Sequence, residues 1–93
     1  MFHLLILNLQ QTIFEGDVKS LTIPAKQGQL TILPNHLPII TPLKNGSISA
    51  VIPSALSQKG VDRIEHSEES ERKYFECSGG ILEFTDNRAV ILL

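Results

Sequence analysis

Apolar and polar residues alternate along most of the chain, and a two-residue period is the pattern of a β-strand with one buried face. Residues 47–52 show it clearly, because Ile48 and Ala50 alternate with Ser47 and Ser49. Turn-forming residues separate such runs, and no stretch has a convincing helical period. The pattern predicts an all-β fold, an antiparallel β-sandwich or flattened barrel of about eight to ten short strands.

The alternation changes phase within residues 13–23. Phe14 and Val18 belong to one set of apolar positions, whereas Leu21 belongs to the other set. An odd shift inside a strand moves all later side chains to the opposite face. We therefore predict a bulge or a sharp bend near residues 19–20, which lets one strand take part in two sheets.

A proline-rich segment, residues 28–46, follows this strand. Pro34 has no backbone donor, so the strand that precedes it must stop there or run along an edge. Asn35 tolerates a left-handed backbone, which predicts that Asn35 and His36 lie at an exposed tip. On the residues alone, His36 is more simply a solvated polar side chain than a contact residue.

The second half of the same segment predicts an edge strand and a hairpin. Residues 37–43 are apolar, but Pro38 and Pro42 cannot complete a ladder of hydrogen bonds, so we predict an edge strand there. Asn45 and Gly46 form the preferred dipeptide of a two-residue type I′ turn, which predicts a hairpin.

Three further features organise the rest of the chain. The polar composition of residues 53–72 predicts a long loop. Gly79 and Gly80 predict a sharp bend in a strand or the close approach of another backbone. Asp86 and Asn87 predict the turn of a last hairpin.

Composition and charge narrow the functional classes. The chain has 93 residues, which predicts one domain, 1–93, and its net charge of −2 gives no support for nucleic-acid binding. The single cysteine, Cys77, cannot form an internal disulfide, and we expect it to be buried as a small hydrophobe. The apolar residues 1–9 lack the features of a signal peptide, and no run is long enough to span a membrane as a helix.

No motif in the sequence predicts catalysis, a metal or a cofactor. The three histidines and Cys77 match no zinc spacing, and no serine lies in a nucleophile elbow. Residues 78–80 lack the lysine and the helix of a phosphate-binding loop. The acidic run at 65–71 lacks the ligand order of a calcium loop. We therefore expect no catalytic residue, no metal ligand and no cofactor.

Two separated blocks resemble a known family. Residues 28–46 read Gly-x-Leu-x-Ile-x-Pro-x-His-x-Pro-Ile-Ile-Thr-x-Leu-Lys-x-Gly, and residues 78–83 read Ser-Gly-Gly-Ile-Leu-Glu. Both resemble the N-terminal domain of the epsilon subunit of F-type ATP synthases. The opening His3-Leu4 and the later Phe14-x-Gly16 are similar to that family too, so the resemblance spans almost the whole chain.

The resemblance implies a non-catalytic rotor subunit of the central stalk. Its implied partners are the gamma subunit and the ring of c subunits, with the catalytic head reached indirectly and the membrane only through the complex. The implied location is peripheral, on the cytoplasmic face of a bacterial inner membrane in preference to an organellar one. The implied c-ring contacts are Lys26, Gln29, Asn35 and His36, and the implied gamma contacts are Asn8, Thr41 and Leu43.

The sequence departs from the family in two places. It ends at Leu93, directly after the last predicted strand, so we do not expect the inhibitory helical hairpin that most members carry. Gln29 stands where some relatives have an acidic residue, so a salt bridge to the ring is not carried over. The alternative function is a free-standing module that binds a sugar or peptide through the loop at 53–72. An exposed apolar patch favours the stalk subunit, and a concave pocket under that loop favours the module.

Overall fold

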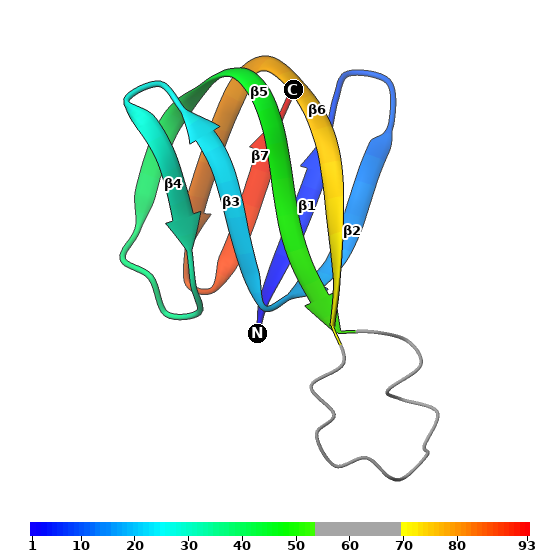
Figure 1. Cartoon of the computed structure of the whole chain (residues 1–93), viewed down its shortest axis with the longest axis vertical. Coiled ribbons are helices and arrows are strands. Elements are labelled where there is room, and N and C mark those ends of the chain that lie inside the picture. The colour runs from blue at the N-terminus through cyan, green and yellow to red at the C-terminus, as the bar shows by residue number, and fades with distance from the viewer. Residues whose placement is uncertain (54–69) are drawn as a thin grey trace, which may run out of the picture.

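The computed structural model describes residues 1–53 and 70–93 (Figure 1), and these residues form strands joined by turns and loops, without a helix. The described part of the chain therefore holds no helix that could cross a membrane. The predicted all-β class is confirmed. The strands are β1 (Phe2–Leu7), β2 (Thr12–Val18), β3 (Ser20–Ala25), β4 (Gly28–Ile32), β5 (Ile39–Pro53), β6 (Ser70–Thr85) and β7 (Arg88–Leu92).

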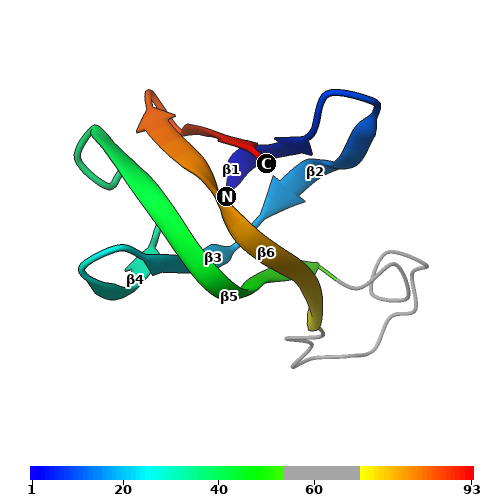
Figure 2. The same ribbon diagram turned by 90° about the horizontal axis from the view of Figure 1, so that it is seen from above.

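All seven strands belong to one sheet in the order β2-β1-β7-β6-β5-β3-β4. Neighbouring strands are antiparallel except β1 and β7, which are parallel. Figure 2 shows β5 and β6 crossing the molecule diagonally, with β1, β2 and β7 on one side and β3 and β4 on the other. The sheet thus folds over on itself to make a sandwich. The described residues hold fewer strands than predicted because β5 and β6, with 15 and 16 residues, each join two of the predicted short strands.

The predicted loop at residues 53–72 falls mostly on residues 54–69, which lie outside the described residues. Its ends are described, and they are strand: Pro53 pairs with Ser70, and Val51 pairs with Arg72. Residues 70–72 therefore belong to β6.

A pair of glycines lets β6 pass from one layer to the other. Cys77 and Leu82 are both buried, although their odd sequence offset would place them on opposite faces of a regular strand. The inward face of β6 therefore changes between them. Gly79 and Gly80 lie at that change with φ of 124° and 129°, a backbone that favours glycine. A Cβ added at Gly80 would lie 2.5 Å from the carbonyl oxygen of Leu92. The predicted bend and the predicted close approach of another backbone therefore both occur.

The predicted hairpin at Asn45 and Gly46 is wrong. β5 continues through both residues, and they pair with Ser78 and Cys77 of β6. Gly46 serves packing instead, because a Cβ there would lie 3.0 Å from the Cβ of Pro24 on β3. Pairing with β6 overrides the local turn preference of the dipeptide.

The predicted phase change near residues 19–20 is confirmed. Val18 at the end of β2 and Leu21 in β3 are both fully buried, although their odd sequence offset would place them on opposite faces of a regular strand. The backbone N–H of Lys19 donates to the carbonyl of Val51, with an N···O distance of 2.6 Å. β2 pairs with β1, and β3 pairs with β4 and β5, so the bend transfers the chain between the two layers.

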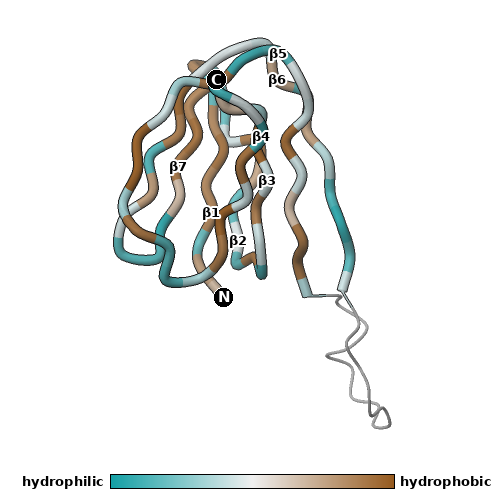
Figure 3. Tube along the Cα trace, turned by 60° about the vertical axis from the view of Figure 1, so that its left-hand side comes forward, coloured by the Kyte–Doolittle hydropathy of each residue, from teal (hydrophilic) through white to brown (hydrophobic). Residues whose placement is uncertain are grey.

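The core lies between the layers, and among the described residues it contains no buried polar side chain. Figure 3 shows hydrophobic and hydrophilic residues alternating along the strands, and the buried set consists of hydrophobic residues. Phe2 and Phe84 meet edge to face at 5.3 Å between ring centroids. The rings of Phe14 on β2 and Phe75 on β6 are in contact, with 5.5 Å between their centroids. Cys77 belongs to this core, as predicted, with 4% of its surface exposed.

Candidate interaction surfaces

The stretch from the end of β4 to the start of β5 exposes three large apolar side chains, which we call the loop patch. They are Leu33, Leu37 and Ile40, with 54%, 77% and 66% of their surfaces exposed. Single exposed leucines are ordinary, whereas contiguous exposed apolar patches mark interaction sites, and these three side chains all lie within residues 33–40. Exposed apolar side chains in this part of the chain are what the stalk-subunit interpretation predicts.

Hydrogen bonds to a distant hairpin hold the loop that carries this patch. Asn35 has a φ of 68° and is exposed, as predicted. Its backbone N–H donates to Oδ1 of Asn87, 2.7 Å away, and Nδ2 of Asn87 donates to Oδ1 of Asn35 at 2.9 Å. Within the loop, the N–H of His36 donates to the carbonyl of Leu33 at 3.1 Å. The loop therefore has a defined conformation.

His36 is half-buried, whereas the sequence predicted an exposed tip residue. Its ring meets that of Phe84 edge to face, with 6.0 Å between centroids. Nδ1 lies 2.7 Å from the carbonyl oxygen of Leu37, and because a carbonyl can only accept, Nδ1 carries the proton. The ring is thus oriented from two sides.

The residues predicted to contact the c-ring lie along one margin of the sheet. Lys26 is in the turn between β3 and β4, and Gln29 is on β4, which is an edge strand (Figure 1). Asn35 and His36 lie in the loop that follows β4. Lys26, Gln29 and Asn35 are exposed. The structure therefore brings the four predicted residues onto or beside the β4 edge.

The residues predicted to contact gamma are less uniform. Asn8 follows β1, and its Oδ1 accepts the backbone N–H groups of Gln10 and Gln11 at 2.8 Å each. Thr41 on β5 is partly exposed, whereas Leu43 is a core residue with 4% of its surface exposed. Leu43 can offer a partner little beyond its backbone.

The edge strand predicted at residues 37–43 is confirmed for residues 39–42, although β5 as a whole lies between β6 and β3. β6 pairs with β5 from Ile39 to Pro53, whereas β3 pairs with β5 only between Leu43 and Val51. Residues 39–42 are thus paired on one side, except that Lys26 N–H donates to the Pro42 carbonyl at 3.0 Å.

A second apolar surface, which sequence reasoning missed, crosses the outside of the layer that contains β1 and β7. Strand register aligns Pro42 with Ile81, Ile81 with Leu92, and Leu92 with Leu7. Paired residues share a face, and Ile81 and Leu92 are each 43% exposed. We call Pro42, Ile81, Leu92 and Leu7 the outer row. The apolar character of both alternating sets in β1 was the signal that could have located it.

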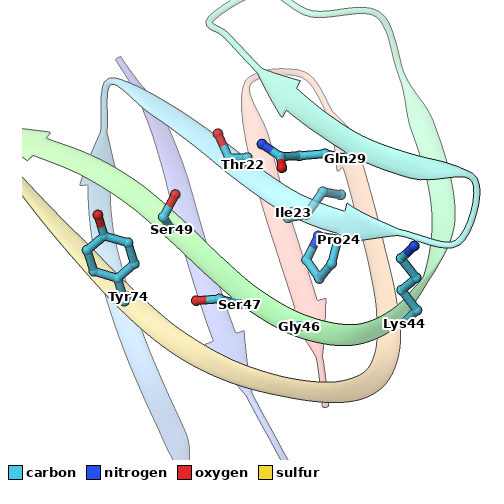
Figure 4. A pocket seen from close by; sticks show the side chains of 9 residues that line it. All are labelled: Thr22, Ile23, Pro24, Gln29, Lys44, Gly46, Ser47, Ser49 and Tyr74. Carbon is cyan, nitrogen blue, oxygen red and sulfur yellow. The ribbon is translucent and has the colours of Figure 1, made fainter.

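The outside of the other layer is polar and holds a groove of about 420 Å³ between β3 and β5. It lies where the pairing of these strands is interrupted, between Thr22 and Ala25. Lys44 stands toward one end and Tyr74 toward the other (Figure 4), and the hydroxyl groups between them come from Thr22, Ser47 and Ser49. Among residues 1–53 and 70–93, the side chains that line this groove include hydroxyl, amide and amino groups but no carboxylate, so they can form hydrogen bonds with a ligand.

One cluster of ionisable groups lies on β1 and β2. Nε2 of His3 is 3.1 Å from a carboxylate oxygen of Glu15, and Nδ1 is 3.4 Å from one of Asp17. The two carboxylates are mostly exposed to solvent, so ion pairs at this position contribute little to stability. No group of three or more histidine, cysteine or acidic side chains in residues 1–53 and 70–93 could hold a metal ion.

Comparison with known families identifies the domain. Over residues 1–93 the sequence matches the family described as "ATP synthase, Delta/Epsilon chain, beta-sandwich domain". The chain belongs to this delta/epsilon family. The sequence resemblance to an epsilon-type β-sandwich is confirmed.

Curated proteins named "ATP synthase epsilon chain" are similar to this member of the delta/epsilon family. Those of Delftia acidovorans and Alkalilimnicola ehrlichii are 32% and 30% identical to it, and each match covers 97% of this chain. The chain spans about half the length of these relatives, 54% in both cases.

Two solved assemblies contain chains with the same fold. One is the Euglena gracilis mitochondrial ATP synthase "OSCP/F1/c-ring", with a TM-score of 0.68, 16% identity, and coverage of 96% of this chain and 48% of that one. The other is the Tetrahymena thermophila mitochondrial ATP synthase "central stalk/cring", with a TM-score of 0.66, 15% identity, and coverage of 97% and 60%.

Proposed function

We propose that this chain is a non-catalytic central-stalk subunit of an F-type ATP synthase, which links the gamma subunit to the c-ring. Membership of the delta/epsilon family supports the proposal, as do the relatives named epsilon chain. Such a subunit transmits torque, so it needs a stiff body and two contact surfaces but no reactive group.

The observation that carries the proposal is the pair of exposed apolar surfaces on the sandwich. The loop patch and the outer row adjoin each other, because Ile40 and Pro42 lie two residues apart on the same side of β5 and both are exposed. Removing such side chains from water against a partner contributes a gross gain of about 25 cal/mol for each Å², from which the costs of association are subtracted. Two neighbouring partners fit this arrangement better than one.

We assign the c-ring to the β4 edge. Lys26, Gln29, Asn35 and His36 supply the polar groups there, and the loop patch supplies the apolar centre. A buried apolar centre with a polar rim is the usual anatomy of a protein interface.

We assign gamma to the outer row and its surroundings. Two of the predicted gamma contacts, Asn8 and Thr41, directly adjoin Leu7 and Pro42 of the row in the sequence. The apolar side chains of the row then provide the contact area that the buried Leu43 side chain cannot. Both partners belong to a membrane complex, so we infer a peripheral location, on the cytoplasmic face of a bacterial inner membrane.

Reciprocal variants test the two assignments. The chain is mixed with detergent-solubilised c-ring and with gamma subunit from the same organism, and each affinity is measured separately. Leu37→Asp should weaken ring binding at least tenfold and leave gamma binding within twofold, because it charges the loop patch. Leu92→Asp should do the reverse, because it charges the outer row.

Tyr74→Asp is the matched control, because Tyr74 is 66% exposed and lies on the polar layer away from both surfaces. Far-UV circular dichroism checks that all three variants fold. If the wild-type chain binds neither gamma nor the ring, the proposed function is wrong. If Leu37→Asp and Tyr74→Asp bind the ring equally, only the ring assignment is wrong.

The alternative is a module that binds a sugar or a peptide, and the polar groove is the observation that favours it. The groove lies between β3 and β5, and the loop at residues 53–72 that was predicted to form the site lies mostly outside the described residues. Titration with a panel of oligosaccharides, followed by the amide NMR signals of Ser47 and Ser49, tests this function. Shifts at these residues would support it.

A further inference from the structure

The loop patch is carried by a connection that makes little ladder pairing of its own. Residues 33–38 lie between the end of β4 and the start of β5. A loop of this kind would sample several conformations unless other parts of the fold restrained it. The restraint comes from the hairpin between β6 and β7, which is distant in sequence.

We propose that Asn87 is a positioning residue that holds this loop in the conformation used for docking. Its side-chain amide makes two reciprocal hydrogen bonds with Asn35, 52 residues away: it accepts from the backbone N–H at 2.7 Å and donates to Oδ1 at 2.9 Å. One amide side chain thus binds both the backbone and the side chain of the loop. This inference rests on the proposed function, because it assumes that the loop docks.

The turn places Asn87 for this task. Asp86 and Asn87 have φ of 50° and 56°, which is a type I′ turn, and Thr85 and Arg88 pair across it. The carbonyl of Asn87 also accepts the N–H of His3 at 3.1 Å, so the start of β1 is tied to the same residue. Asn87 therefore joins three segments at this end of the sandwich.

A second contact from the same hairpin supports the loop. Phe84 is fully buried in the core and meets the His36 ring edge to face at 6.0 Å. The apolar side chains of the loop patch thus stay exposed while the backbone beneath them is anchored at Asn35 and His36. Pre-organisation of this kind raises affinity because the loop need not be ordered on binding.

Asn87→Gly separates positioning from folding. Asp-Gly is a preferred type I′ dipeptide, so the turn keeps its geometry while both hydrogen bonds to Asn35 are lost. Asn87→Asp keeps the acceptor for the Asn35 N–H and loses the donor, so it should act as a partial rescue. Asp86→Gly is the matched control, because it changes the neighbouring left-handed position and leaves the amide pair intact.

Two measurements on the full chain decide the matter. Hydrogen exchange of the Asn35 amide, followed by NMR, should accelerate at least about tenfold in Asn87→Gly, and thermal stability should change little. Affinity for the detergent-solubilised c-ring should fall about tenfold, because a binding-competent loop populated one-tenth of the time lowers affinity by that factor.

Each outcome decides a different claim. Unchanged exchange at Asn35 in Asn87→Gly overturns the positioning role, whatever the chain binds. Faster exchange with unchanged ring affinity shows that the held conformation is not the one used for docking, and this overturns the inference as well. Failure of the wild-type chain to bind the ring refutes the proposed function, and the exchange result still tests whether Asn87 holds the loop.

Discussion

Gly80→Ala tests how β6 passes from one layer of the sandwich to the other. Gly79 and Gly80 have φ of 124° and 129°, so alanine at either position carries backbone strain of about 1–3 kcal/mol. Only at Gly80 does the added Cβ meet another strand, 2.5 Å from the Leu92 carbonyl oxygen, whereas at Gly79 it meets nothing within 4 Å. Gly79→Ala is therefore a matched control with similar strain and no collision.

The collision at Gly80 is with backbone, so a side-chain rotation cannot relieve it and β7 must move. Overpacking of this kind costs a further 1–3 kcal/mol, roughly. We therefore expect the free energy of unfolding to fall by about 2–6 kcal/mol in Gly80→Ala and by about 1–3 kcal/mol in Gly79→Ala. A difference of 1 kcal/mol corresponds to about 4–8 °C in Tm for a domain of this size.

Urea unfolding followed by far-UV circular dichroism is the suitable assay, because the chain has no tryptophan and one tyrosine. The slope of the free energy against urea should be the same for both variants if only stability changes. Equal losses in the two variants, within about 0.5 kcal/mol, would refute the argument that close contact between β6 and β7 requires glycine at position 80.

Three further substitutions or reactions test the packing. Leu82→Ala removes a fully buried side chain and should lower the free energy of unfolding by about 2–5 kcal/mol. Ile81→Ala changes a position that is 43% exposed, so its loss should be less than half as large. Similar losses in the two variants would contradict the assigned faces of β6. Gly46→Ala places a Cβ 3.0 Å from the Cβ of Pro24 and should lower the free energy of unfolding by about 1–3 kcal/mol in the same urea assay. An unchanged free energy of unfolding would show that β5 can shift at this position. Cys77 is 4% exposed, so a thiol reagent should label it in urea but not in the native protein, and rapid native labelling would place it outside the core.

The amide pair between Asn35 and Asn87 shows how a hairpin can serve a surface that it does not itself form. The two residues are far apart in the sequence, yet each sits at a left-handed position where a polar side chain is tolerated. The same local preference that makes asparagine a turn residue thus leaves its amide free to bind another loop.

Features that depend on neighbouring residues could be predicted from the sequence. The two-residue period predicted strands, the odd shift between Val18 and Leu21 predicted the bend that joins β2 to β3, and Asp86-Asn87 predicted the last turn. Each is decided by side-chain alternation or by backbone preference within a few residues. Three of the four predicted ring contacts, Gln29, Asn35 and His36, lie in the family motif at residues 28–46, and the structure places them on one margin of the sheet.

Features that depend on strand pairing needed the tertiary structure. Asn45 and Gly46 carry a strong turn signal, but the ladder with β6 and the ring of Pro24 hold them in a continuous strand. The outer row exists only because parallel pairing of β1 with β7 aligns Leu7 with Leu92. Likewise, nothing near Leu43 in the sequence reports that its side chain lies in the core. Local patterns determine which residues form strands, whereas register and layer order decide which faces meet solvent, and those choices are made between residues far apart in the chain.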